Sequence, residues 1–114
     1  MSQAVVPPKA KLHLVGLKNC SACDELQVQL KKPEIKKDLE AKYGTSEYDI
    51  IYPEEENEGG AKAINICASL DKFYAPMLTV EHAPEKDGDK SRVCLIDEKL
   101  DETRCAVLKE LPVK

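Results

Sequence analysis

Residues 11–30 read KLHLVGLKNCSACDELQVQL, and two cysteines separated by two residues lie in the middle of this stretch. Residues 12–17 are mainly apolar and too few for a stable helix, which predicts a buried strand. Residues 21–30 carry leucines on one helical face and predict an amphipathic helix. Cys20 and Cys23 therefore fall where a strand ends and a helix begins, and the chemistry of that junction is the main question that the sequence raises.

The length and composition of the chain are those of one globular domain. It has 114 residues, of which 42% are hydrophobic and 33% are charged, a balance typical of soluble proteins. Pro7 and Pro8 discourage regular structure near the start. We therefore expect a flexible lead-in at residues 1–10 and a single domain over residues 11–114.

Charge and hydropathy argue against several classes of function. The formal net charge of −4 and the pI near 5.2 disfavour a nucleic-acid binder, because such proteins normally carry a basic surface. No apolar run reaches the roughly 20 residues that span a bilayer. The opening MSQAVVPPKAK lacks the basic and apolar segments of a secretory signal. We expect a cytoplasmic protein with no membrane or nucleic-acid partner.

The hydrophobic pattern predicts a strand–helix–strand unit followed by a helix, a hairpin and a last helix. The predicted elements are a strand at 12–17, a helical segment at 21–43 that kinks or restarts at Pro33 and stops at Gly44, a strand at 48–52, a helix at 61–74, strands at 77–82 and 92–97, and a helix at 98–111. The acidic segment at 53–60 is expected to be a solvated loop. The first unit requires parallel strands and the hairpin antiparallel ones, so we expect a mixed sheet with helices on both faces.

The last predicted helix depends on the spacing of its apolar residues. Four of them share one helical face, namely Leu100, Val107, Leu108 and Leu111.

Cys20 and Cys23 have the spacing that thiol–disulfide exchange requires. A free cysteine with a pKa of about 8.5 is mostly protonated at neutral pH, whereas the thiolate is the attacking species. The N-terminus of a helix stabilises an anion through free N–H groups and a partial positive charge, and Lys18 would add to this effect. Cys23 lies one turn further on, within reach of a mixed disulfide at Cys20. We predict Cys20 as the exposed nucleophile and Cys23 as the buried resolving thiol.

Two other interpretations of the cysteine pair stay open. Two cysteines on a helix can simply pack in the core, and a C-x-x-C motif also begins many zinc sites. A zinc site would need two more ligands, and none of the candidates forms a second close pair. These candidates are Cys67, Cys94, Cys105, His13 and His82. A metal or iron–sulfur site shared between subunits through Cys20 is the form of this alternative that remains.

The other cysteines and His13 are expected to be structural. Five cysteines with irregular spacing do not resemble the framework of a secreted scaffold, so we expect mostly free thiols in a reducing compartment. Intracellular proteins of hyperthermophiles, which can be rich in disulfides, are the exception. Cys67, Cys94 and Cys105 are expected to pack in the core. Cys105 lies off the apolar face of the last predicted helix and is the best candidate for an accessory thiol. His13, among apolar neighbours, is expected to be hydrogen-bonded rather than catalytic.

The segment FYAPMLTV places Pro76 directly before a strand, where a proline does not interrupt a ladder of hydrogen bonds. A cis bond before proline is far less costly than before any other residue. The spacing alone fits a cis and a trans proline equally well.

With these features placed, the sequence resembles the thioredoxin-fold proteins, and in size and layout it is closer to the glutaredoxins. The resemblance covers about residues 11–111 and depends on CSAC after the first strand, on YAP before the third strand and on the element order. It implies a thioredoxin-like fold with a central mixed four-stranded sheet flanked by helices. It also implies that Cys20 attacks and Cys23 resolves. In that family the proline, here Pro76, is cis and faces the cysteines, and the residue before it, here Ala75, binds the peptide or glutathione through its backbone.

The expected function is therefore that of a small dithiol oxidoreductase active in electron transport. Cys20 and Cys23 are the predicted catalytic residues, and Lys18, Ala75 and Pro76 are the predicted substrate-binding residues. We expect no tightly bound cofactor, glutathione as a candidate reductant, a protein disulfide or glutathione as substrate, and a monomer or weak dimer. The motif lacks the proline of C-P-Y-C, and LIDEKLDETR lacks the glycine pair that grips glutathione in glutaredoxins. A non-catalytic interaction module is therefore the alternative, beside the metal or iron–sulfur binder.

Overall fold

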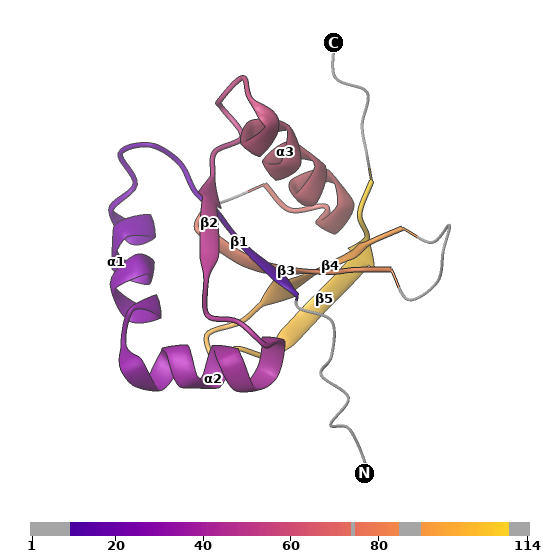
Figure 1. Ribbon diagram of the computed structural model, residues 1–114. Coiled ribbons are helices and arrows are strands. Elements are labelled where there is room, and N and C mark those ends of the chain that lie inside the picture. Colours follow the sequence, from indigo (N-terminus) through magenta and orange to yellow (C-terminus); the bar gives the residue numbers. More distant parts are fainter. Residues whose placement is uncertain (1–9, 74, 85–89, 110–114) are drawn as a thin grey trace.

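The computed structural model describes residues 10–73, 75–84 and 90–109, and it has an α/β architecture (Figure 1). Its elements in chain order are β1 (Lys11–Val15), α1 (Ser21–Leu30), α2 (Pro33–Tyr43), β2 (Tyr48–Ile51), α3 (Glu58–Leu70), β3 (Met77–His82), β4 (Arg92–Ile96) and β5 (Glu102–Val107). The strands form one sheet in the order β2-β1-β3-β4-β5. The predicted α/β class is confirmed, but the prediction of four strands is wrong because β5 adds a fifth. Residues 1–9 of the predicted lead-in lie outside the described residues, and so do residues 85–89, between the two strands of the predicted hairpin.

The sheet is mixed, as the element order predicted. Strands β1 and β2 run parallel and are connected through α1 and α2, whereas β3, β4 and β5 continue the sheet with antiparallel pairings. Val15 at the end of β1 pairs with Ile51 at the end of β2 and with Met77 at the start of β3. Three chain segments therefore meet at one edge of the sheet: those that follow β1 and β2 and the one that precedes β3. The cysteine pair lies at this edge.

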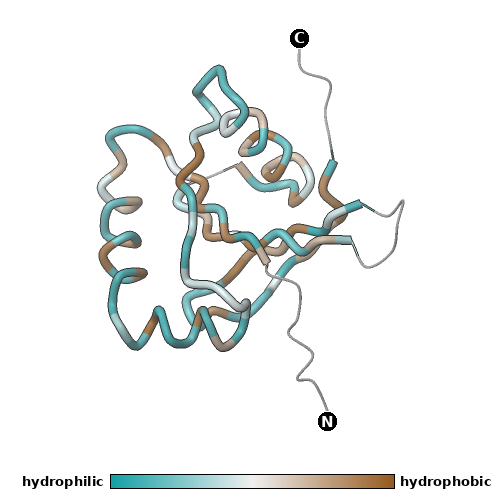
Figure 2. The backbone as a smooth tube through the Cα atoms, viewed as in Figure 1, coloured by the Kyte–Doolittle hydropathy of each residue, from teal (hydrophilic) through white to brown (hydrophobic). Residues whose placement is uncertain are grey.

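Helices cover both faces of the sheet, which confirms that part of the prediction. Successive residues of a strand point to opposite faces. Leu12 and Leu14 belong to an apolar cluster with residues of α1 and α2, whereas Val15 belongs to a second cluster with residues of α3. Figure 1 shows α1 and α2 on one side of the sheet and α3 on the other. Figure 2 shows hydrophobic residues along the strands and hydrophilic residues on the outer turns of the helices.

Pro33 and Gly44 set the limits of α2. Pro33 is the first residue of this helix, a position where its missing N–H has no helical partner to lose. The helical segment at 21–43 is therefore two helices rather than one kinked helix. Gly44 ends α2 with a φ of 77°, a left-handed conformation, and its N–H donates to the Glu40 carbonyl at 2.9 Å. The predicted stop at Gly44 is confirmed.

The boundaries of α3 differ from the prediction because of its caps. The helix begins at Glu58, three residues before the predicted start, because the Asn57 side chain accepts the N–H of Gly60 at 2.7 Å. It ends at Leu70 because Asp71 has a φ of 56°, which turns the chain out of the helix.

The last predicted helix, at 98–111, is wrong: residues Glu102–Val107 form the strand β5. Leu100 and Leu108 do not share a helical face, because Leu100 packs in the cluster under α1 and α2 while Leu108 packs in the cluster under α3. The turn between β4 and β5 is held by Asp97, whose carboxylate accepts the N–H groups of Lys99 and Asp101, both at 2.9 Å. Leu111 lies outside the described residues.

Candidate functional site

Cys20 and Cys23 form a disulfide at the start of α1. Cys20 is the N-cap residue of the helix, and the two Cα atoms are 5.2 Å apart, so the bond closes without unwinding the first turn. Cys20 is partly exposed, whereas Cys23 is only 4% exposed. The difference in exposure expected of the two sulfurs is present, while their chemical roles stay predictions.

At the junction between β1 and α1, a backbone N–H donates a hydrogen bond to the sulfur of Cys20. Asn19 has a φ of 59°, which asparagine adopts more readily than most residues. The extended Cys20 that follows places its Sγ so that the N–H of Cys23 donates to it at 3.1 Å. The start of a helix carries a partial positive charge. A thiolate at Cys20 would be stabilised by both this charge and a charge-assisted hydrogen bond.

Gly16 brings the end of β1 against the second sulfur. Its N–H donates to the Ile51 carbonyl at 3.0 Å, which continues the pairing of β1 with β2. A Cβ built on Gly16 would lie 3.7 Å from the Cys23 Sγ and 3.4 Å from the Tyr52 ring. This close approach of the backbone helps to keep the Cys23 sulfur away from water.

The bond between Ala75 and Pro76 is cis, which the family resemblance implied and the spacing alone left undecided. Pro76 directly precedes Met77, which pairs with Val15. The predicted substrate-binding pair, Ala75 and Pro76, therefore lies at the same edge of the sheet as Gly16, the residue that contacts Cys23.

A small apolar hollow of about 220 Å³ opens at this edge. Gly16, Leu17 and Ala75 line it, together with Cys67 and Phe73. Leu17 is 46% exposed and Phe73 is 70% exposed. An exposed apolar surface of this kind, beside the Cys20–Cys23 pair, is suited to contact an unfolded or extended peptide.

The acidic segment after β2 folds against the loop that carries Lys18, a proximity that the sequence reasoning missed. The Lys18 N–H donates to the Glu54 carboxylate at 3.0 Å, and its ammonium lies 3.8 Å from the Glu55 carboxylate. The charge of Lys18 is therefore shared with Glu55 rather than directed at Cys20 alone. This contact could have been predicted from the parallel pairing of β1 with β2, because the loops that follow two neighbouring parallel strands leave the sheet at the same edge.

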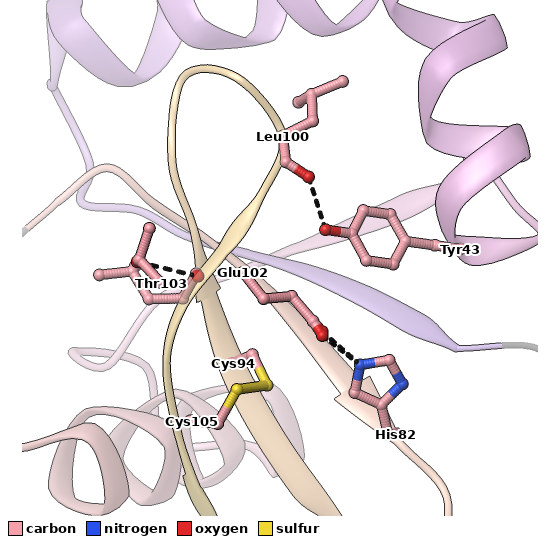
Figure 3. Close-up of a disulfide and its surroundings, with 8 residues drawn as sticks. Tyr43, His82, Cys94, Leu100, Glu102, Thr103 and Cys105 are labelled. Carbon is pink, nitrogen blue, oxygen red and sulfur yellow. Dashed lines mark hydrogen bonds and ion pairs between the residues drawn. A yellow bond between two sulfur atoms is a disulfide. The ribbon is translucent and has the colours of Figure 1, made fainter.

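Cys94 packs in the core, as predicted, whereas the prediction is wrong for Cys105, which is exposed. The expectation that both are free thiols is also wrong, because they form a second disulfide (Figure 3). The two residues are paired directly across β4 and β5, with Cα atoms 4.0 Å apart. The sequence placed Cys105 on a helix, where no such pairing could be foreseen. Cys67 is free and buried, as predicted, and burial raises the pKa of its thiol, which makes it less reactive.

His13 is hydrogen-bonded, as expected, and is itself buried between two carboxylate side chains. Its Nδ1 is 2.6 Å from the Asp49 carboxylate and its Nε2 is 2.9 Å from the Glu81 carboxylate. Glu81 also accepts from the Lys62 ammonium at 3.0 Å. Burial alone lowers the pKa of His13, but the hydrogen bonds and charges of Glu81 and Asp49 outweigh it and raise this pKa above 6.5. The hydrogen bond from His13, together with Lys62 and against the effect of burial, lowers the pKa of Glu81 to about 2.

A search of the described residues for groups that could hold a metal ion finds His82, Cys94 and Glu102, and this group contains neither Cys20 nor Cys23. No described helix has the length and apolar character to cross a bilayer. Comparison of the chain with protein-family models, with curated proteins and with solved structures found no match. The resemblance to the thioredoxin fold therefore stays a prediction from the sequence.

Proposed function

We propose that the protein is a thiol–disulfide oxidoreductase with a thioredoxin-like fold, which exchanges disulfides through Cys20 and Cys23. The observation that carries this proposal is the position of the pair: a partly exposed sulfur at the N-cap of α1, facing the N–H of Cys23 and bonded to a buried partner. The sheet order β2-β1-β3-β4 and the cis bond before Pro76 support the same fold. Strand β5 lies where the spacing of apolar residues predicted a helix.

The reaction balances with the two cysteines alone. In the reduced protein the Cys20 thiolate attacks one sulfur of a substrate disulfide, which forms a mixed disulfide and releases the other sulfur as a thiolate that takes a proton from water. Cys23 then loses its proton and attacks the Cys20 sulfur, which releases the second substrate sulfur. The substrate has gained two electrons, and the protein holds the Cys20–Cys23 disulfide, which an external dithiol or glutathione reduces again.

A protein disulfide fits this site better than glutathione. The hollow beside Ala75 is apolar and carries the exposed side chains of Leu17 and Phe73, which suit an extended peptide. Glu54 and Glu55 lie against the loop of Lys18, and they disfavour a small anionic thiol by charge repulsion. Glutathione is therefore not the preferred substrate, and it is retained as a candidate reductant beside an external dithiol. The protein is proposed to act as a monomer or weak dimer in the cytoplasm.

The decisive experiment traps the reaction intermediate. A Cys23→Ser variant lacks the resolving thiol, so we expect it to accumulate mixed disulfides with its substrates through Cys20, identified by mass spectrometry of non-reduced peptides. The matched Cys20→Ser variant keeps only the buried sulfur and should trap nothing. Equal trapping by both variants, or none by either, would contradict the proposal. Titration of the Cys20–Cys23 pair against glutathione buffers then gives its reduction potential.

A non-catalytic interaction module is the second candidate, favoured by the exposed Leu17 and Phe73 beside the cysteines. It predicts that a Cys20→Ser/Cys23→Ser chain keeps its full activity in cells, whereas an oxidoreductase loses it.

A further inference from the structure

The side chains of His82 and Glu102 meet beside the second disulfide (Figure 3). The His82 Nε2 lies 3.0 Å from one carboxylate oxygen of Glu102 and 3.1 Å from the other. The nitrogen of His82, the oxygen of Glu102 and the Sγ of Cys94 all lie within 4.8 Å of one another. This group of donor atoms is remote from Cys20 and Cys23 and has no part in the proposed exchange reaction.

The register of three neighbouring strands brings these groups together. His82 on β3 pairs with Arg92, two residues before Cys94 on β4, and Glu102 on β5 pairs with Ile96, two residues after Cys94. Residues two apart on a strand point to the same face. The side chains of His82, from β3, and Glu102, from β5, therefore reach Cys94 from the two neighbouring strands. They pair with each other beside its sulfur.

The donor set is the one that zinc prefers. Zn²⁺ is bound tetrahedrally by thiolate sulfur, imidazole nitrogen and carboxylate oxygen, at four positions in a structural site. His82, Cys94 and Glu102 offer one nitrogen, one sulfur and one oxygen within 4.8 Å of one another, and the sulfur of Cys105, bonded to that of Cys94, is the fourth donor of the proposed site. In the disulfide neither sulfur is a thiolate, so the oxidised pair cannot act as two strong ligands.

We propose that Cys94, Cys105, His82 and Glu102 form a zinc site that the redox state of the Cys94–Cys105 pair controls. A dithiol reductant attacks the sulfur of Cys105, which is an exposed residue of the outer strand, and the buried Cys94 leaves as a thiolate. The donor's second thiol resolves the mixed disulfide, so the donor ends as a disulfide and the protein gains two electrons and two protons. Zn²⁺ then binds both sulfurs and releases those two protons to solvent.

The zinc ion would replace the disulfide as the connection between β4 and β5. Residues 102–105 of β5 are exposed, so little apolar burial holds this part of the strand to the sheet. In the oxidised protein the disulfide joins the two strands covalently. In the reduced protein the metal would join them through four coordinate bonds and would add β3 through His82.

The test measures zinc binding in both redox states. The Cys20→Ser/Cys23→Ser chain removes the other pair, and the protein is reduced and then freed of reductant by anaerobic gel filtration. Competition with a chromogenic chelator should give one Zn²⁺ per reduced chain and none per oxidised chain. His82→Ala and Glu102→Gln should each weaken binding at least about tenfold. Glu98→Gln, which removes the same charge from the neighbouring turn, should leave the affinity unchanged.

Two further measurements separate a built site from loose thiols. Co²⁺ in place of Zn²⁺ should give the visible absorption of a tetrahedral ion with thiolate ligands in the reduced chain, and this spectrum should change in His82→Ala. Circular dichroism shows whether the reduced chain keeps its fold. The proposal is overturned by a reduced chain that binds no zinc, by equal binding in the oxidised chain, or by binding that is insensitive to both the His82 and Glu102 changes, whether the chain is folded or not.

Discussion

At the scale of single residues, the charged network around His13 has the clearest energetic consequence. His13 is 5% exposed and Glu81 is 9% exposed, and buried charges of this kind are tolerated only when they are paired. Asp49, Glu81 and Lys62 supply the pairing. Removing one member leaves the others partly uncompensated, which costs more than the pair itself contributes to stability.

The network predicts a stability that depends on pH in two directions. The raised pKa of His13 means that its contribution is fully present below the ordinary value of 6.5 and is lost as the pH rises through the folded value. The lowered pKa of Glu81 means that its contribution is fully present above 4.5 and is lost as the pH falls toward about 2. We therefore expect the network to stabilise the fold most between pH 4.5 and 6.5.

Urea unfolding of the His13→Gln variant over this range tests the prediction. The variant should be less stable by about 3 kcal/mol in that window, and the difference from the unsubstituted protein should shrink as the pH rises. In a His13→Gln/Glu81→Gln chain, the loss of stability as the pH falls from 4.5 toward about 2 should also disappear. A difference that stays constant with pH would show that His13 contributes through packing rather than through its charge.

At the scale of elements, the start of α3 fixes the acidic loop beside Lys18. Gly60 lies in the first turn, where its N–H is capped by Asn57, and a Cβ at this position would collide with the carbonyl oxygen of Glu55. A Cβ on the neighbouring Gly59 would lie 3.2 Å from a methyl group of Ile51 and 3.3 Å from the Asn57 Oδ1, so it would press on side chains but on no backbone atom. The fold of the loop therefore requires the second glycine more strongly than the first.

A comparison of Gly60→Ala with Gly59→Ala tests this difference. Gly60→Ala should lower the free energy of unfolding by about 1–3 kcal/mol, because the backbone of the loop must move. Gly59→Ala should change it by less than about 1 kcal/mol, since alanine favours the helix and its tight contacts are with side-chain atoms of Ile51 and Asn57 rather than with backbone. Thermal and urea unfolding give both values. Equal decreases in the free energy of unfolding for the two variants would mean that the contact between the Glu55 carbonyl and Gly60 does not restrict this position.

The elements that the sequence predicted well are those whose signals are local. Pro33 and Gly44 restrict the backbone at their own positions, and the apolar run after Lys11 is unambiguous as a strand. The error at β5 has a different origin. Leu100 and Leu108 have the spacing of residues on one helical face, yet they pack on opposite faces of the sheet. The end of a turn and the strand β5 lie between them. The Cys94–Cys105 bond depends on the pairing of two strands, so it could not be found once one strand was taken for a helix.

At the scale of the whole molecule, one edge of the sheet gathers the proposed reaction site from three chain segments. The motif follows β1, the acidic loop follows β2, and the cis Ala75–Pro76 bond precedes β3. The motif itself could be predicted because its two cysteines lie close in sequence. The acidic loop and the hollow near Phe73 could not, because their position depends on which strands are neighbours.

The apolar hollow predicts a preference for protein substrates, which rests on the proposed function. A Phe73→Ser variant should raise the KM for a protein disulfide by roughly fivefold, since an exposed aromatic contact contributes about 1 kcal/mol, and should leave kcat unchanged. Its activity on a small-molecule disulfide should not change. Val28→Ser, which removes another exposed apolar side chain from α1, is the matched control. A similar rise in KM for both variants would mean that the hollow has no special role.

The strand order also limits how the two disulfides of one chain can communicate. Cys23 lies beyond the end of β1, while Cys94 lies within β4, two strands away in the sheet, a lateral distance of about 10 Å. Sulfur atoms exchange only when they touch, so a chain cannot pass electrons from its first pair to its second internally. Such a transfer must be bimolecular: between copies of this protein its rate would grow with the square of the concentration, and a dilute sample would keep its two pairs in separate redox states.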